Sequence, residues 1–231
     1  MYTVDSALSE FAEHGEIWIQ QKLQGKLNTI FDVGANIGAW TMMSRQYNPQ
    51  AEFHLFELVP QTYKLLLDTV ATSSKIVPNG FGLADEYKTI PVQYVPQHPE
   101  LSTQYYNLRL DSAETVTGIV IPGDDYVVSR NVQTIDYLKI DVEGAEGKVL
   151  RGFTKALTAK RIGIIQFEYS YHALLDRWLL VDWYTLLRPL GYHLGKLTPT
   201  GIQFHEYTYR YETFNGPDYV AVHETKMNLF E

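Results

Sequence analysis

The chain has 231 residues, a length that suits one domain of ordinary to large size. Its net charge is −8 and it contains no basic run, so we do not expect a nucleic-acid partner, because phosphate contacts need clustered lysine and arginine. The absence of cysteine excludes a disulfide framework and a thiolate zinc site. The N-terminus does not read as a signal peptide and no apolar run reaches membrane-spanning length, so we expect a cytoplasmic protein that does not bind a membrane.

The first third of the chain alternates between helix and strand patterns. Hydrophobic periodicity, proline and glycine predict, in chain order, a helix over 5–23, a strand over 29–33, a helix over 40–46, a strand over 51–57, a helix that begins at Pro60 and a strand over 75–83. We interpret residues 1–28 as an N-terminal helical segment and residues 29–231 as the main domain.

The stretch 89–128 differs, because short β-like pieces stand among polar, proline and glycine residues; it predicts a hairpin and an irregular insertion around 94–128. Beyond it the pattern predicts a strand over 135–142, a helix over 145–159, a strand over 162–167, a helix over 173–187, and β runs over 201–209 and 219–223. This alternation implies an α/β fold with a mainly parallel sheet and helices on both faces. Ligands of such sheets bind beyond the carboxyl ends of the strands.

A glycine loop follows the first predicted strand. Its pattern is D-x-G-x-N-x-G, with Asp32, Gly34, Asn36 and Gly38 at the fixed positions. A dinucleotide loop would have glycine where Asn36 and Ala39 stand. S-adenosylmethionine (SAM) has no pyrophosphate, and its charged methionine part suits a strand-end acid, backbone carbonyls and a helix N-terminus. The loop therefore favours SAM, although an ordinary strand–turn–helix would show similar residues.

A second acidic residue, Glu57, closes the second predicted strand, 25 positions after Asp32. A carboxylate at this place can accept both hydroxyl protons of a ribose, and the usual offset is roughly 20 residues. The alternative is a solvent-exposed glutamate at a strand end. Because Glu57 suits any unphosphorylated ribose, it supports cofactor binding without separating SAM from NAD.

Three carboxylates follow the apolar strand at 135–142: Asp141, Glu143 and Glu146. Asp141 is expected at the carboxyl edge, where it could be a general base, contact the cofactor, or hold Mg²⁺ together with Glu143. Acids near a helix start also stabilise the helix dipole, which is the role expected for Glu146. Lys139, on the same strand face as Asp141, is expected to be an ion-pair partner.

Glu168 ends the next predicted strand, and His172 follows it. This places a second carboxylate and an imidazole at the productive edge of the sheet. Either could accept a proton from a substrate, although a lone histidine is more often structural.

Together these elements resemble the FkbM family of SAM-dependent methyltransferases. The resemblance rests on Phe31–Gly38, on Phe56-Glu57 with Pro60, and on Leu138–Glu146 with Val149-Leu150 and Gly152. It implies a three-layer class I (Rossmann-like) fold with a mostly parallel seven-stranded sheet and an antiparallel strand near the C-terminus. It also implies contacts of the loop glycines and Asn36 with the methionine part of SAM, of Glu57 with the ribose, and of the stretch around Phe81 and Ala84-Asp85 with the adenine. Family members methylate hydroxyl groups of sugars and polyketide-type natural products.

The sequence thus predicts a SAM-dependent O-methyltransferase acting on a hydroxyl of a small or carrier-tethered acceptor. Asp141, His172 or Glu168 would take the proton, or Mg²⁺ at Asp141 and Glu143 would lower the acceptor pKa. The insertion is expected to shape the acceptor pocket. Two alternatives are a catalytically silent SAM-binding domain and a nucleotide-dependent oxidoreductase. The oligomeric state is left open.

Overall fold

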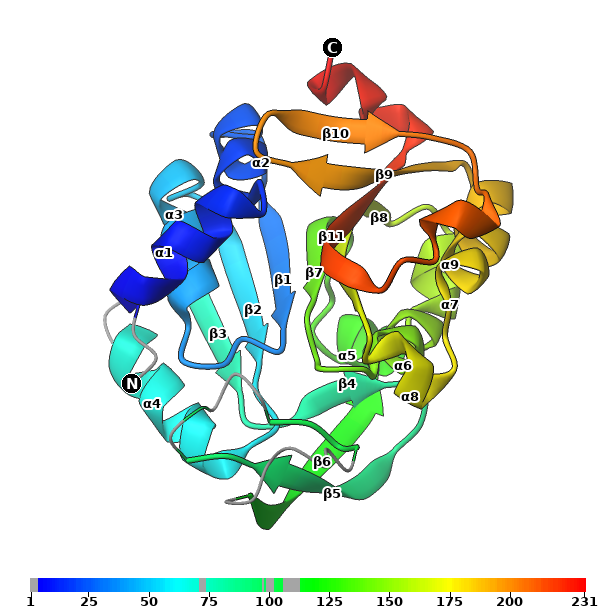
Figure 1. Cartoon of the computed structure of the whole chain (residues 1–231). Helices are drawn as coiled ribbons and strands as arrows, with labels where there is room; N and C mark the ends of the chain where they lie inside the picture. Colours follow the sequence, from blue (N-terminus) through cyan, green and yellow to red (C-terminus); the bar gives the residue numbers. More distant parts are fainter. Residues whose placement is uncertain (1–3, 71–73, 97, 99–101, 106–112) are drawn as a thin grey trace.

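The structure is a computed structural model that describes residues 4–70, 74–96, 98, 102–105 and 113–231. Across these residues, a central eight-stranded sheet has the order β10-β9-β11-β8-β7-β1-β2-β3, and a smaller sheet has the order β4-β6-β5 (Figure 1). The strands are β1 Thr29–Val33, β2 Glu52–Phe56, β3 Ile76–Asn79, β4 Gly82–Ala84, β5 Lys88–Tyr94, β6 Glu114–Pro122, β7 Ile135–Ile140, β8 Ile162–Ser170, β9 Tyr192–Thr198, β10 Gly201–Phe204 and β11 Asn215–His223.

The central sheet confirms the predicted class I architecture. Strands β3, β2, β1, β7 and β8 are neighbours in parallel register. β11 runs antiparallel between β8 and β9, as expected for the strand near the C-terminus. β10 pairs antiparallel with β9 at the edge, so the sheet has one strand more than the seven expected.

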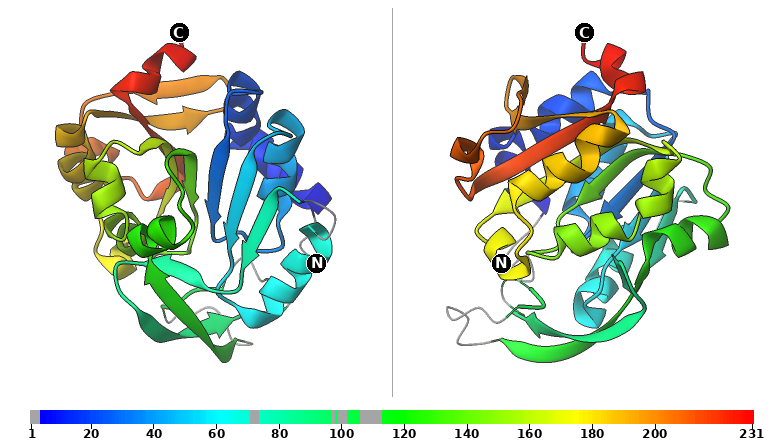
Figure 2. Two further views of the ribbon diagram at one scale, coloured as in Figure 1. Left: turned by 180° about the vertical axis from the view of Figure 1, so that it is seen from behind. Right: turned by 90° about the vertical axis from the view of Figure 1, so that its right-hand side faces the viewer.

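Helices cover both faces of the sheet, which makes the three predicted layers (Figure 2). One face packs against α1 Val4–Glu13, α2 Glu16–Lys22, α3 Ala39–Tyr47 and α4 Pro60–Val70. The other packs against α5 Gly123–Ser129, α6 Glu146–Arg151, α7 Thr154–Thr158 and α9 Leu180–Leu187. In β1, Ile30 and Phe31 belong to opposite clusters, because successive side chains of a strand point to opposite faces. None of the described helices is both long and apolar enough to cross a membrane.

Three helices that the periodicity predicts as continuous are interrupted. The helix expected over 5–23 breaks at Gly15, whose φ of 86° is left-handed. The helix expected over 145–159 is two short ones, α6 and α7. The helix expected over 173–187 ends as α8 Ala173–Asp176, because Arg177 has φ 55°. A new helix then starts where the Leu179 N–H donates to the Asp182 carboxylate at 2.7 Å.

Several strand boundaries also differ from the prediction. The strand expected over 75–83 is two strands, β3 and β4, which belong to different sheets. The sequence predicts Glu168 at the end of a strand, but β8 continues to Ser170, so Glu168 lies within the strand. Strand β9 and helix α5 were not predicted. β5 and β6 form the expected hairpin pairing, and residues 97, 99–101 and 106–112 of the predicted insertion lie outside the described residues.

Candidate active site

The loop after β1 makes a tight turn at the carboxyl edge of the sheet. Gly34, Asn36 and Gly38 have φ of 89°, 49° and 87°. Gly34 approaches the end of β7 so closely that a Cβ there would lie 1.7 Å from the Asp141 carbonyl oxygen. Gly34 and Ala35 both donate their N–H to the Phe56 carbonyl oxygen at 3.0 Å. The loop is therefore fixed between the ends of β2 and β7, and only glycine fits at position 34.

Glu57, directly after β2, is buried with 7% of its surface exposed. Its carboxylate accepts the Asn36 N–H at 2.9 Å and the Val59 N–H at 2.7 Å. Burial raises the pKa of Glu57 to about 7, although these backbone hydrogen bonds act in the opposite direction. Two backbone donors thus fix the orientation of the carboxylate, and its remaining lone pairs can accept ligand hydroxyl groups.

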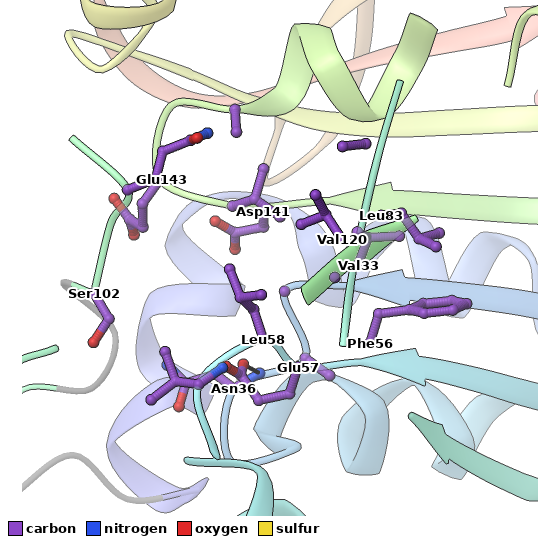
Figure 3. A pocket seen from close by; sticks show the side chains of 18 of the residues that line it. Val33, Asn36, Phe56, Glu57, Leu58, Leu83, Ser102, Val120, Asp141 and Glu143 are labelled. Atoms are coloured by element: carbon purple, nitrogen blue, oxygen red, sulfur yellow. Dashed lines mark hydrogen bonds between the residues drawn. The ribbon is translucent and has the colours of Figure 1, made fainter. Parts of the chain in front are cut away.

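A pocket opens between these loops and the small sheet (Figure 3). Among the residues predicted from the sequence, it is lined by Gly34, Asn36, Glu57, Asp141 and Glu143. Leu58, Leu83 and Val120 give the pocket an apolar part, and Figure 3 shows Leu58 between Asp141 and the Asn36 and Glu57 side chains, with Val120 and Leu83 to one side of Asp141. The Asn36 amide oxygen is buried and has no hydrogen-bond partner among the described residues.

The other predicted site residues lie outside the described lining of this pocket. Asp32 is fully buried and accepts the Thr41 hydroxyl at 2.6 Å. Gly38 is the N-cap residue of α3. The Phe81 ring lies 6.0 Å from the Phe56 ring, centroid to centroid, and packs against the core on the face of the sheet that α5, α6 and α7 cover. Glu168, within β8, and His172, just after β8, lie next to Glu143.

Asp141 forms an ion pair with Lys139, as expected, and their Oδ2 and Nζ atoms are 2.6 Å apart. Lys139 is 4% exposed. Burial works to lower the pKa of Lys139, but the surrounding carboxylates, Asp141 first and Asp32 next, raise it well above its usual value. Lys139 is therefore a fixed positive charge that orients the Asp141 carboxylate at the pocket.

Glu143 faces a different partner. Its Oε2 lies 3.0 Å from Nδ1 of His172, which is 6% exposed. One donor atom each of Glu143, Glu168 and His172 lies within 4.8 Å of the others. We call these three residues the carboxylate–histidine cluster. Burial is the main cause of the lowered pKa of His172 and of the strongly raised pKa of Glu168.

Glu146, expected to stabilise the start of a helix, has a local structural role. Its carboxylate accepts the Val142 N–H at 3.0 Å and the Gly144 N–H at 3.1 Å, and so it fixes the loop that carries Glu143. Burial raises its pKa to about 7. It is absent from the described lining of the pocket.

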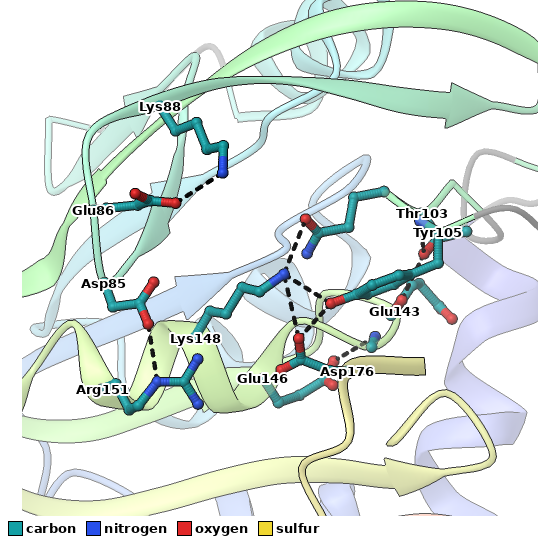
Figure 4. Close-up of polar contacts among 12 residues, drawn as sticks. Asp85, Glu86, Lys88, Thr103, Tyr105, Glu143, Glu146, Lys148, Arg151 and Asp176 are labelled. Carbon is teal, nitrogen blue, oxygen red and sulfur yellow. Dashed lines mark hydrogen bonds and ion pairs between the residues drawn. The ribbon is translucent and has the colours of Figure 1, made fainter. Parts of the chain in front are cut away.

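Sequence analysis missed a polar contact between the insertion and the main domain, shown in Figure 4. Lys148 of α6 lies 2.8 Å from the Tyr105 hydroxyl and 3.2 Å from the Asp176 carboxylate, and Tyr105 also donates to Asp176. Lys148 and Gln104 line the pocket. These residues come from three distant segments, so no sequence pattern could have brought them together.

The chain is similar in sequence to known methyltransferases. The sequence profile of the methyltransferase FkbM domain matches residues 32–194. The hexuronic acid methyltransferase AglP of Haloferax volcanii is 26% identical over 167 residues, which cover 66% of this chain and 66% of that protein. The 31-O-demethyl-FK506 methyltransferase FkbM of Streptomyces tacrolimicus is 25% identical over 158 residues, which cover 56% of this chain and 60% of that protein. The chain thus matches just under two thirds, or less, of the length of each of these curated relatives.

A solved structure, the precorrin-6y C5,15-methyltransferase of Geobacter metallireducens GS-15, aligns with 90% of this chain and 85% of its own, at a TM-score of 0.47 and 12% identity. The profile match covers well over half of the sequence, including the glycine loop, Glu57 and the strand that ends at Asp141. The chain therefore belongs to the methyltransferase FkbM domain family.

Proposed function

We propose that the chain is a SAM-dependent O-methyltransferase that methylates a hydroxyl group of a sugar or natural-product acceptor, either free or carrier-tethered. The observation that carries the proposal is the pocket itself, which joins the glycine loop, the buried Glu57 carboxylate and Asp141 at one edge of the sheet. Family membership and the O-methylation named in the FK506 relative support the same chemistry.

The residues present suit the chemical groups of SAM. The buried, unpartnered Asn36 amide oxygen is an acceptor at the methionine end, where the ligand has an ammonium group. The Glu57 carboxylate is placed for ribose hydroxyls. The apolar side chains of Leu58, Leu83 and Val142 suit the flat faces of an adenine. SAM supplies an electrophilic methyl group on a sulfonium, so the protein needs mainly to position the acceptor and accept its proton.

Methyl transfer forms an oxygen–carbon bond as the carbon–sulfur bond breaks, with the electron pair going to sulfur and the hydroxyl proton to a base. Of the three predicted bases, Asp141 lines the pocket, whereas Glu168 and His172 lie outside its described lining, next to Glu143. His172 is nearly buried and its lowered pKa favours the neutral imidazole at pH 7, the form that can accept a proton. Asp141 is already paired with Lys139, which makes it the better orienting group.

Calorimetric titration of the purified chain with SAM, S-adenosylhomocysteine and NADH tests the cofactor. We expect heat with the first two ligands and none with NADH; binding of NADH alone would favour the oxidoreductase. A mass-spectrometric screen with sugars and hydroxylated natural products then tests for a gain of one methyl group. Tight SAM binding without turnover of any acceptor would favour the silent SAM-binding domain.

A further inference from the structure

The carboxylate–histidine cluster has the composition of a cation site. Glu143 lies in the loop after β7, Glu168 within β8 and His172 just after β8. Parallel pairing of β7 with β8 brings them together, and one donor atom of each lies within 4.8 Å of the others. Donors so close can contact one cation at the usual ligand distances of about 2.0–2.6 Å.

The surroundings of Glu168 provide a second, independent observation. Within the described parts of the chain, no hydrogen bond or ion pair engages its carboxylate. The charged groups that act on it most strongly are other acids, Glu143 first and Asp141 next. A partly buried carboxylate beside other acids is unfavourable unless a positive charge joins it.

Two lysines described near the cluster, Lys139 and Lys148, have other partners. Lys139 is paired with Asp141 at 2.6 Å. Lys148 contacts Tyr105 and Asp176. His172 faces Glu143, with Nδ1 3.0 Å from Oε2, and a neutral imidazole offers a metal ion a lone pair rather than a charge.

We propose that Glu143, Glu168 and His172 bind a divalent cation that accepts both oxygen and nitrogen donors, such as Mn²⁺. Two carboxylates and one imidazole are a mixed donor set that suits this class of ion. Three protein ligands also leave coordination positions open for water or a substrate oxygen. The site differs from the pair Asp141 and Glu143 expected from the sequence, since Asp141 is held by Lys139.

Because Glu143 also lines the pocket, the cation would lie beside the place where the acceptor must sit. This use of the ion rests on the proposed methyl transfer. A hydroxyl group coordinated by the cation loses its proton to water more readily, and its oxygen can then form the bond to the methyl carbon while the electron pair of the carbon–sulfur bond goes to sulfur. His172 would act as a ligand and not as the base.

The test is a titration of the EDTA-treated, desalted chain with Mn²⁺. The electron paramagnetic resonance signal of free Mn²⁺ measures how much of the ion stays unbound at each point. We expect one site, with binding weakened roughly 10- to 100-fold or more in Glu168→Gln and in His172→Gln. Glu206→Gln is the matched control, because that side chain is 78% exposed and outside the cluster; its affinity should equal that of the unsubstituted chain. Circular dichroism and thermal unfolding of each variant check that it is folded.

No binding of Mn²⁺ by the unsubstituted chain, or binding that both cluster variants retain, would overturn the proposal. Calorimetry with SAM on the same preparation separates this failure from a failure of the proposed function. SAM binding without Mn²⁺ binding removes the cation site alone. Mn²⁺ binding that depends on the cluster, without SAM binding, would support the cation site and contradict the proposed methyltransferase function.

Discussion

Glu57 and Glu168 are both carboxylates beside parallel strands, and burial is the main cause of the raised pKa of each. Their partners differ. The Glu57 carboxylate accepts two backbone N–H groups, whereas the Glu168 carboxylate has no hydrogen bond or ion pair within the described residues. The same type of side chain is therefore held by backbone donors in one place. In the other it is a group that lacks a positive partner, which is why we infer a cation there.

The largest effect is expected from Gly34→Ala, which tests how rigid the glycine loop after β1 is. The substitution combines a φ of 89° with a Cβ 1.7 Å from the Asp141 carbonyl oxygen. We expect a loss of at least about 3 kcal/mol in the free energy of unfolding, measured with urea. Gly25→Ala is the matched control, because φ is 71° there but no atom lies within 4 Å. It should lose only about 1–2 kcal/mol, and equal losses would contradict the steric explanation.

Glu57→Gln should lower the affinity for SAM about 30- to 100-fold. The amide keeps one acceptor oxygen, but its NH₂ group meets a backbone N–H and loses a charge-assisted hydrogen bond, a loss of roughly 2–3 kcal/mol. Calorimetry measures the affinity. Glu52→Gln is the control on the same strand, since that side chain is 57% exposed. An unchanged affinity in Glu57→Gln would remove Glu57 from the donor site.

Glu168→Gln, unlike the two substitutions above, should improve a property of the chain: it should raise the free energy of unfolding in EDTA. A carboxylate whose pKa is raised by folding contributes fully to the stability of the chain below its unfolded pKa, near 4.5. That contribution is lost as the pH rises toward the folded pKa. At about pH 8 the uncharged variant should therefore be more stable by about 1 kcal/mol or more, the amount that one pKa unit represents. Unfolding in urea at about pH 5 and about pH 8 measures the difference.

Excess Mn²⁺ should reverse that order, since a ligand that binds only the folded state stabilises it. The unsubstituted chain would gain stability and Glu168→Gln would not. Glu224→Gln, at an exposed carboxylate (56% exposed), should follow the unsubstituted chain in both conditions. A Glu168→Gln variant that is less stable in EDTA at about pH 8 would mean that the carboxylate has a favourable partner, and the comparison with Glu57 would fail.

The fold was largely predictable because its signals are local. The strands β1, β2 and β7 are short apolar runs bounded by polar residues, and the glycine loop follows β1 directly. Helix continuity was not predictable. Apolar periodicity continues across Gly15 and Arg177, whereas the left-handed backbone at these residues is set by what the flanking helices pack against.

The sequence by itself determined the donor side of the site. Gly34, Asn36 and Glu57 belong to two consecutive strands and their loops, and parallel pairing of these strands leaves them close together in any fold of this class. Only the tertiary structure decided the rest. The register of β7 against β8 brings Glu143 to His172, because side chains of distant segments meet only once the strands are aligned.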